Sequence, residues 1–162
     1  MSANLATVPQ MELLRRAIRT ILVEASIWDE DAVLIERQTN TWNDIAIAMA
    51  AAAHGSILVV GIAEGNPTEQ DGLEEELTVV ATLLAKNTLT PDQVPEELLW
   101  EKTVRVLHNA VPSYPGGVDH WHYRLRYQGF RDAPELLDEH EEIAQLARQG
   151  TFKVKFSLQP DH

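Results

Sequence analysis

The chain contains no cysteine among its 162 residues. Disulfide bonds and thiolate chemistry are therefore excluded, which fits a reducing compartment. Positive charge is scarce as well, with 13 Lys and Arg against 25 Asp and Glu, and the net charge is -12. Binding to phosphate backbones needs clustered basic residues, so this composition argues against specific nucleic-acid binding. An acidic surface of this kind repels nucleic acid.

Long hydrophobic runs are also absent. The least charged stretch, residues 45–62, is interrupted at residues 54–56, and it predicts a helix followed by a strand rather than a membrane span. The N-terminus lacks the basic and apolar segments of a signal peptide, so we expect no export signal there. Hydrophobic residues make up 44% of the chain, enough to build a core. We expect a flexible arm over residues 1–8 and one domain over 9–160.

Periodicity and turn residues predict the fold class. Apolar residues at one-turn spacing predict helices, and Thr41 followed by Asp44 is typical of a helix start, giving helices over 11–24, 42–54, 96–110 and 135–148. Apolar β-branched stretches predict a short strand over 32–38 and an antiparallel hairpin from 56–63 and 73–84. Adjacent strands between helices are typical of an α+β fold, here a mainly antiparallel sheet of about four strands with helices packed on one face.

Two further stretches, 120–128 and 151–158, alternate strictly between two kinds of side chain. Successive side chains of a β-strand point to opposite faces. One face would carry apolar and aromatic residues: Trp121, Tyr123, Leu125, Tyr127, Phe152, Val154, Phe156 and Leu158. The other would carry His120, His122, Arg124, Arg126, Lys153 and Lys155. An acidic chain would therefore have a basic side on one sheet.

Three functions are open to this basic side. It would bind nucleic acid if its aromatics could stack on bases, but alternation places them on the opposite face. It would protect an edge strand, where lysine is common. It would form a charged interface with the acidic surface of a neighbouring subunit, and such head-to-tail contacts close into rings. The interface candidates are His122, Arg124, Arg126, Lys153 and Lys155.

Metal binding has weak candidates in His120 and His122, which share a strand face, with Asp119 and residues 140–142 further away. Arg124 and Arg126 continue the same face, and cations repel a metal ion. We therefore predict no metal site and no cofactor.

Catalytic patterns are equally sparse. Residues 61–65 follow a strand and contain two glycines, but they lack the third glycine or the lysine of a phosphate loop, so we predict a turn. Acidic clusters are plentiful, yet nothing marks one carboxylate as different from its neighbours. We predict no catalytic residue. The alternatives are a small metal-dependent or acid/base enzyme that uses His120, His122 and nearby carboxylates, and a small adaptor domain of a bacterial cytoplasm.

The order of elements resembles the tail-terminator and tail-completion proteins of long-tailed phages and their prophage and minor-tail relatives. The resemblance covers the first helix, the helix and strand over 42–64, the strand over 73–84, the helix over 95–110 and two late strands, with Ile57–Gly61 and Gly150–Val154 most alike. It implies a non-enzymatic structural protein that caps or joins the tail tube as a ring, typically a hexamer, and contacts other tail or head-tail proteins. It also implies a place in the host cytoplasm during assembly and then in the virion. The acidic segment Asp138–Glu142 departs from the family pattern.

Overall fold

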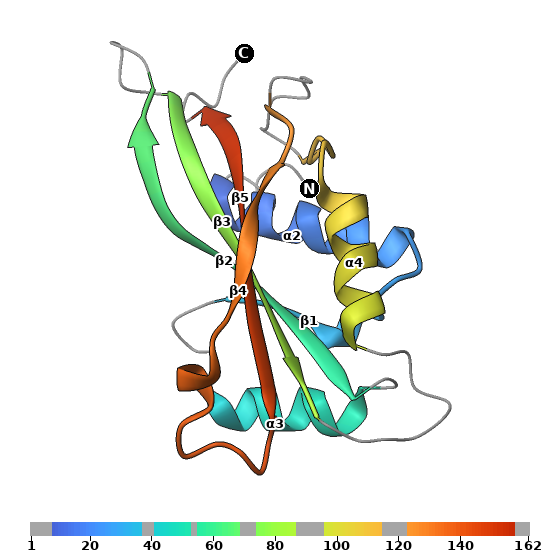
Figure 1. The fold of residues 1–162 in the computed structure, drawn as a ribbon. Helices are drawn as coiled ribbons and strands as arrows, with labels where there is room; N and C mark the ends of the chain where they lie inside the picture. The colour runs from blue at the N-terminus through green and yellow to red at the C-terminus, as the bar shows by residue number, and fades with distance from the viewer. Residues whose placement is uncertain are drawn as a thin grey trace.

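The computed structural model describes residues 8–36, 41–52, 55–68, 74–86, 96–114 and 123–157. Its centre is a five-stranded sheet of order β1-β2-β3-β5-β4 (Figure 1). The strands are β1 (Val33–Ile35), β2 (Ser56–Pro67), β3 (Glu74–Ala85), β4 (Arg126–Asp132) and β5 (Leu146–Ser157). β1 and β2 run parallel, whereas β2 and β3, β3 and β5, and β5 and β4 pair antiparallel. This confirms the predicted α+β class and the predicted hairpin, and the short strand predicted over 32–38 is β1, which gives five strands where about four were expected.

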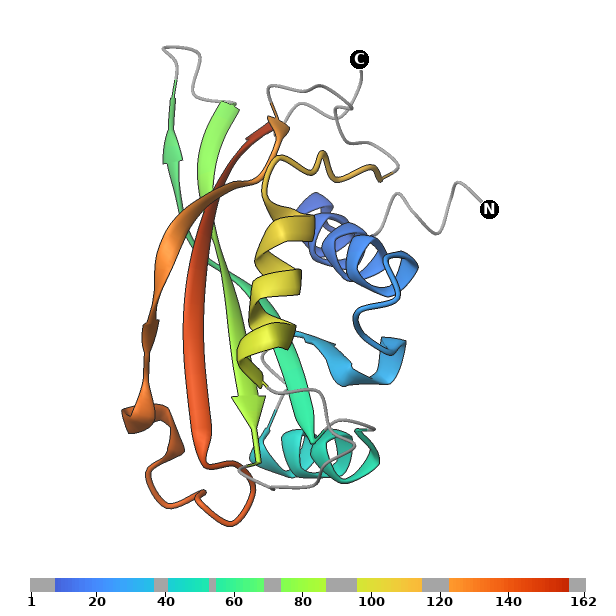
Figure 2. The same cartoon turned by 45° about the vertical axis from the view of Figure 1, so that its right-hand side comes forward.

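Two helices, α2 (Gln10–Glu24) and α4 (Glu96–Leu107), cover one face of the sheet, as Figure 2 shows. Both bury the residues that recur at one-turn spacing, including Leu14, Ile18 and Leu22 in α2 and Leu99 and Leu107 in α4. The other face of the sheet has no helix over its middle in the described part of the chain (Figure 2). We call this side the open face.

The third helix, α3 (Trp42–Ala51), lies at the end of the sheet where β2 begins and β3 ends (Figures 1 and 2). Thr41 starts it with a capping box, because its hydroxyl accepts a hydrogen bond from the Asp44 amide at 3.3 Å and its own amide donates to the Asp44 carboxylate at 3.1 Å. The Trp42 ring stacks on His140 at 4.1 Å. The helix ends at Ala51, before residue 54 where the sequence places its end.

The covered face is held by close contacts between helix and strand. Trp100 of α4 lies directly over Gly150 of β5, where an added Cβ would come within 2.6 Å of the indole. Trp28 is buried in the segment before β1, and its indole donates to the Thr103 hydroxyl of α4 at 2.9 Å. These contacts fix α4 against the sheet.

The strand predicted over 120–128 begins later than expected. Residues 115–122 lie outside the described part of the chain, and β4 runs from Arg126 to Asp132. The strand also ends later than expected, since it continues through Gly129 beyond residue 128. Gly129 has a φ of 108°, and the pairing with β5 shifts between Tyr127 and Gly129. Glycine permits this conformation, so the strand continues past a β-bulge.

The helix predicted over 135–148 was also wrong. Residues Pro134–Leu137 form a short 3₁₀ helix, turns follow, and Glu139 adopts a left-handed φ of 70°. Four acidic side chains between residues 138 and 142 repel one another, which disfavours a regular helix. Residues 146–148 instead extend β5 and pair with residues 83–85 of β3. Strand pairing thus outweighs the local helical spacing.

The turn predicted over 61–65 was wrong as well, because β2 continues through it to Pro67. Gly61 lies under the Glu36 carboxylate, where an added Cβ would come within 3.0 Å of the side chain. Gly65 packs against Leu77 and Glu75 in the same way. Both glycines therefore permit close approach of a neighbouring side chain rather than a reversal of the chain.

Candidate functional site

A row of small residues crosses the open face. Gly61 pairs with Val80, Val80 with Thr151, and Thr151 with Gly129, so the row runs across four strands. Small side chains leave space above the strands, and a hollow of about 460 Å³ lies there. A neighbouring hollow of about 350 Å³ shares Ala63, Val80 and Gln149 with it.

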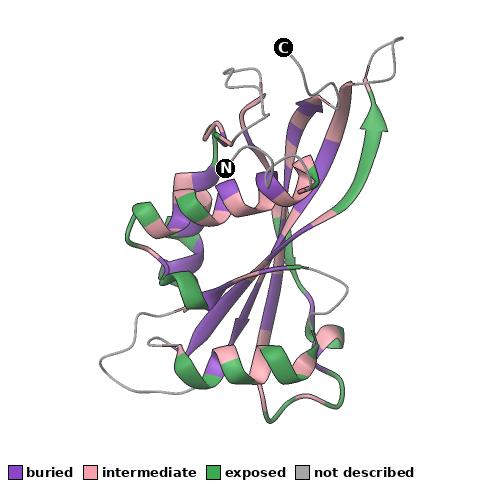
Figure 3. Ribbon diagram, turned by 180° about the vertical axis from the view of Figure 1, so that it is seen from behind, coloured by how far each residue is buried: buried purple, intermediate pink, exposed green. Residues whose placement is uncertain are grey.

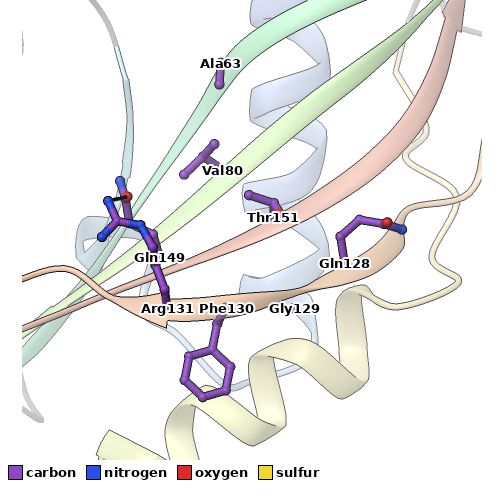
Figure 4. Close-up of a pocket in the computed structure, with 8 residues that line it drawn as sticks. All are labelled: Ala63, Val80, Gln128, Gly129, Phe130, Arg131, Gln149 and Thr151. Atoms are coloured by element: carbon purple, nitrogen blue, oxygen red, sulfur yellow. Dashed lines mark hydrogen bonds between the residues drawn. The ribbon is translucent and has the colours of Figure 1, made fainter.

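Polar side chains border the larger hollow. Figure 4 shows Arg131 and Gln149 on the same side of the sheet as Val80 and Thr151, with Arg131 donating to Gln149 at 3.5 Å. The Phe130 ring points to the opposite side, where the Arg148 guanidinium lies 4.3 Å from its centre. The hollow therefore has a small, partly apolar floor and a rim that carries amide and guanidinium groups.

The predicted basic side belongs to this open face. Arg126 lies opposite Lys153 in the register, whereas Tyr127 lies opposite the buried Phe152 on the other face. The two cations have partners within the chain. Arg126 forms an ion pair with Glu76 at 2.8 Å, and Lys153 donates to the Thr78 hydroxyl at 2.6 Å. Both Arg126 and Lys153 stay partly exposed, and with Glu76 beside Arg126 this part of the face carries accessible charges of both signs.

Of the other predicted residues of the basic side, two lie near Arg126 and Lys153, and two lie outside the part of the chain that the structure describes. Lys155 is opposite Glu76 in the register and partly exposed. Arg124 precedes β4 and is half-buried. His120 and His122 lie outside the described residues. The structure thus brings together Arg126, Lys153 and Lys155.

The residues that form the hollow were missed from the sequence: Val80, Gly129, Arg131, Gln149 and Thr151. The available indication was glycine inside a strand, which often marks a bulge or a place where another chain approaches closely. Gly61 and Gly129 lie at the two ends of the row.

The titratable groups whose pKa values are clearly shifted keep the protonation state that their residue type ordinarily has at pH 7. Burial, and then a hydrogen bond at 2.8 Å to Glu74, raises the pKa of Tyr123 to about 12. Burial likewise raises the pKa of Tyr114 to about 12. The Arg148 guanidinium donates to Asp132 and lowers the pKa of that carboxyl. Each of these three shifts moves away from pH 7, so none prepares a general acid or base for catalysis there.

Within the described ranges, no three His, Asp or Glu side chains lie together in a way that would hold a metal ion. No helix in those ranges is long and apolar enough to cross a bilayer. No protein-family model matches the chain, and a search of curated proteins finds no match.

Proposed function

We propose that this protein is a non-enzymatic assembly protein of a phage or prophage, of the tail-terminator or tail-completion type, that works as a ring of identical copies. The open face is the observation that supports this proposal. It is broad, partly apolar and bordered by cations, and its side chains bond to one another across strands. Such a surface is better suited to binding another protein than to catalysing a reaction.

Charge supports the same conclusion. Arg126, Arg131, Lys153 and Lys155 lie on the open face of a chain whose net charge is -12, and Glu76 and Glu135 pair with the two arginines. The basic edge of one copy therefore meets predominantly acidic surface on the next, which favours ordered head-to-tail contact. Heterologous contacts of this kind close into a ring when the rotation between copies permits. The remaining acidic surface would keep a lumen that passes DNA from binding it.

The test is the assembly state, measured with and without tail tubes. We expect native mass spectrometry to find a closed oligomer of the purified protein. Some rings form only on their target, so electron microscopy should also examine tubes reconstituted from the tube protein of the same genome. A protein that stays monomeric alone and leaves those tubes uncapped would contradict the proposal.

A further inference from the structure

Helix α3 is apolar on all sides. Every residue except Asn43 and Asp44 is apolar, yet only Met49 is buried. Ile47 is 64% exposed, and Ala50 and Ala51 are exposed beside it. Figure 3 shows the exposed and half-buried classes along most of the helix. A helix that is apolar all round is normally enclosed by protein, so this side of α3 lacks a partner in the single chain as described.

The open face has the dimensions to receive such a helix. An α-helix of ten residues, the length of α3, is about 15 Å long. Four neighbouring strands span about 14 Å, the length of the row from Gly61 to Gly129, and the Glu36 carboxylate covers the Gly61 end of that row. The small side chains of the row leave the hollow of about 460 Å³ at its centre. The alanines of α3 let it approach a backbone closely.

We propose that α3 of one copy docks on the open face of the next copy, with Ile47 inserted into the hollow above Val80 and Thr151. Helix-on-sheet packing is a common way for a sheet to cover its second face. Asp44 is the only charged residue of α3 and is exposed. Arg131, which pairs with Glu135 at 2.6 Å and stays exposed, borders the hollow at β4, whereas the Glu36 carboxylate lies over Gly61 at the other end of the row. Opposite charges therefore orient the helix with its N-terminus toward β4.

This inference rests on the proposed function and names the contact that would hold the ring. The inserted helix lies at one end of the sheet, and the receiving hollow lies across its middle (Figures 1 and 4). The contact therefore joins two different surfaces of the chain. Each copy inserts its own α3 into one neighbour and receives the α3 of the other neighbour in its hollow. Such a contact continues from copy to copy until the ring closes.

Two variants separate the two halves of the contact. Ile47→Glu places a charge on the helix, and Thr151→Glu places one in the hollow. We expect each variant alone to be monomeric, with an unchanged circular dichroism spectrum. Leu98→Glu is the matched control, because Leu98 is an exposed apolar residue of α4, and this variant should assemble like the wild type.

Mixing the two variants gives the sharpest result. The Ile47→Glu copy keeps an intact hollow, and the Thr151→Glu copy keeps an intact helix. The mixture should therefore form a 1:1 heterodimer that cannot grow, at least tenfold tighter than either variant with itself, by native mass spectrometry and sedimentation. If the wild type forms rings on its own, assembly of the variants is measured on the purified proteins. If it forms rings only on tail tubes, assembly is measured on the tubes.

Three results would overturn the docking contact. These are normal assembly of either variant, loss of assembly in Leu98→Glu to the same degree, and a mixture that stays monomeric. If the wild type nevertheless forms rings, the proposed function stands and another contact holds them. A wild type that is monomeric both alone and on tubes removes both proposals.

Discussion

Arg148 is the clearest case of a single residue whose environment is set by the fold. It is only 8% exposed, donates to Asp132 at 2.7 Å and to Glu97 at 3.2 Å, and lies over the Phe130 ring. Asp132→Ala should destabilise the protein at pH 7 by about 1 kcal/mol, because the pair is partly screened by water but its cation is buried. Urea unfolding measures this loss.

The same residue gives a pH dependence with a definite sign. The bond from Arg148 lowers the pKa of Asp132 in the folded protein below the unfolded value of about 3.9. Its stabilisation is therefore present above that value and is lost as pH falls through the folded pKa. The wild type and Asp132→Ala should converge in stability between pH 4 and pH 2. A constant difference, or an equal loss in the exposed control Glu24→Ala, would contradict this origin.

Thr103 gives a second prediction at the residue scale. Its buried hydroxyl accepts from the Trp28 indole at 2.9 Å and donates to the Leu99 carbonyl at 2.8 Å. Thr103→Val keeps the shape but leaves the indole N–H without its acceptor, which should cost about 1–3 kcal/mol. Thr103→Ser keeps the hydroxyl and should cost less. Equal losses in the two variants, measured by thermal and urea unfolding, would show that packing matters more than the hydrogen bond.

At the scale of elements, the contact of α4 with β5 depends on one glycine. Gly150→Ala would place a methyl group within 2.6 Å of the Trp100 ring, which is 3% exposed and has little room to move. We expect a loss of about 1–3 kcal/mol from overpacking. In a Trp100→Phe background the same substitution should cost less, because the smaller ring leaves space. Additive losses in this double-mutant cycle would contradict the contact.

The elements that the sequence predicts well are those whose pattern and boundaries agree locally. Leu14, Ile18 and Leu22 recur at one-turn spacing in α2, and Thr41 with Asp44 marks the start of α3. The segment 135–148 misleads because its helical spacing is local, whereas its last residues pair with β3 about sixty residues away. A local sequence pattern does not reveal this competition between helix formation and strand pairing with a distant segment.

The candidate site likewise combines features that local sequence patterns predict with features that they do not predict. Alternation places Arg126 and Lys153 on one face without knowledge of the register. The hollow, in contrast, requires that Gly61, Val80, Thr151 and Gly129 align across four strands. That alignment depends on pairings between distant parts of the chain and on the bulge between Tyr127 and Gly129. Sequence patterns therefore predict the charge of this face but not its shape.

At the scale of the whole molecule, the open-face cations should matter for assembly and little for folding. Replacing Arg126, Lys153 and Lys155 together by Ser removes one partly exposed ion pair, which is worth about 0–1 kcal/mol, and the hydrogen bond from Lys153 to Thr78. We expect the monomer to stay folded and the oligomer to weaken. The matched control replaces Arg19, Lys102 and Arg105, three cations of α2 and α4. Unchanged oligomer size by light scattering, or equal weakening in the control, would count against the interface.

The stacking of Trp42 on His140 has a further consequence for a ring. It ties the first turn of α3 to the segment between β4 and β5, and so adds to the contacts with β2 and residues 30–32 that set the inclination of the helix to the sheet. In the proposed head-to-tail assembly, the inclination of α3 sets the rotation from each copy to the next. This rotation determines how many copies complete the ring. His140→Ala would therefore change the copy number, or open the circle into a spiral, while leaving the docking surfaces intact.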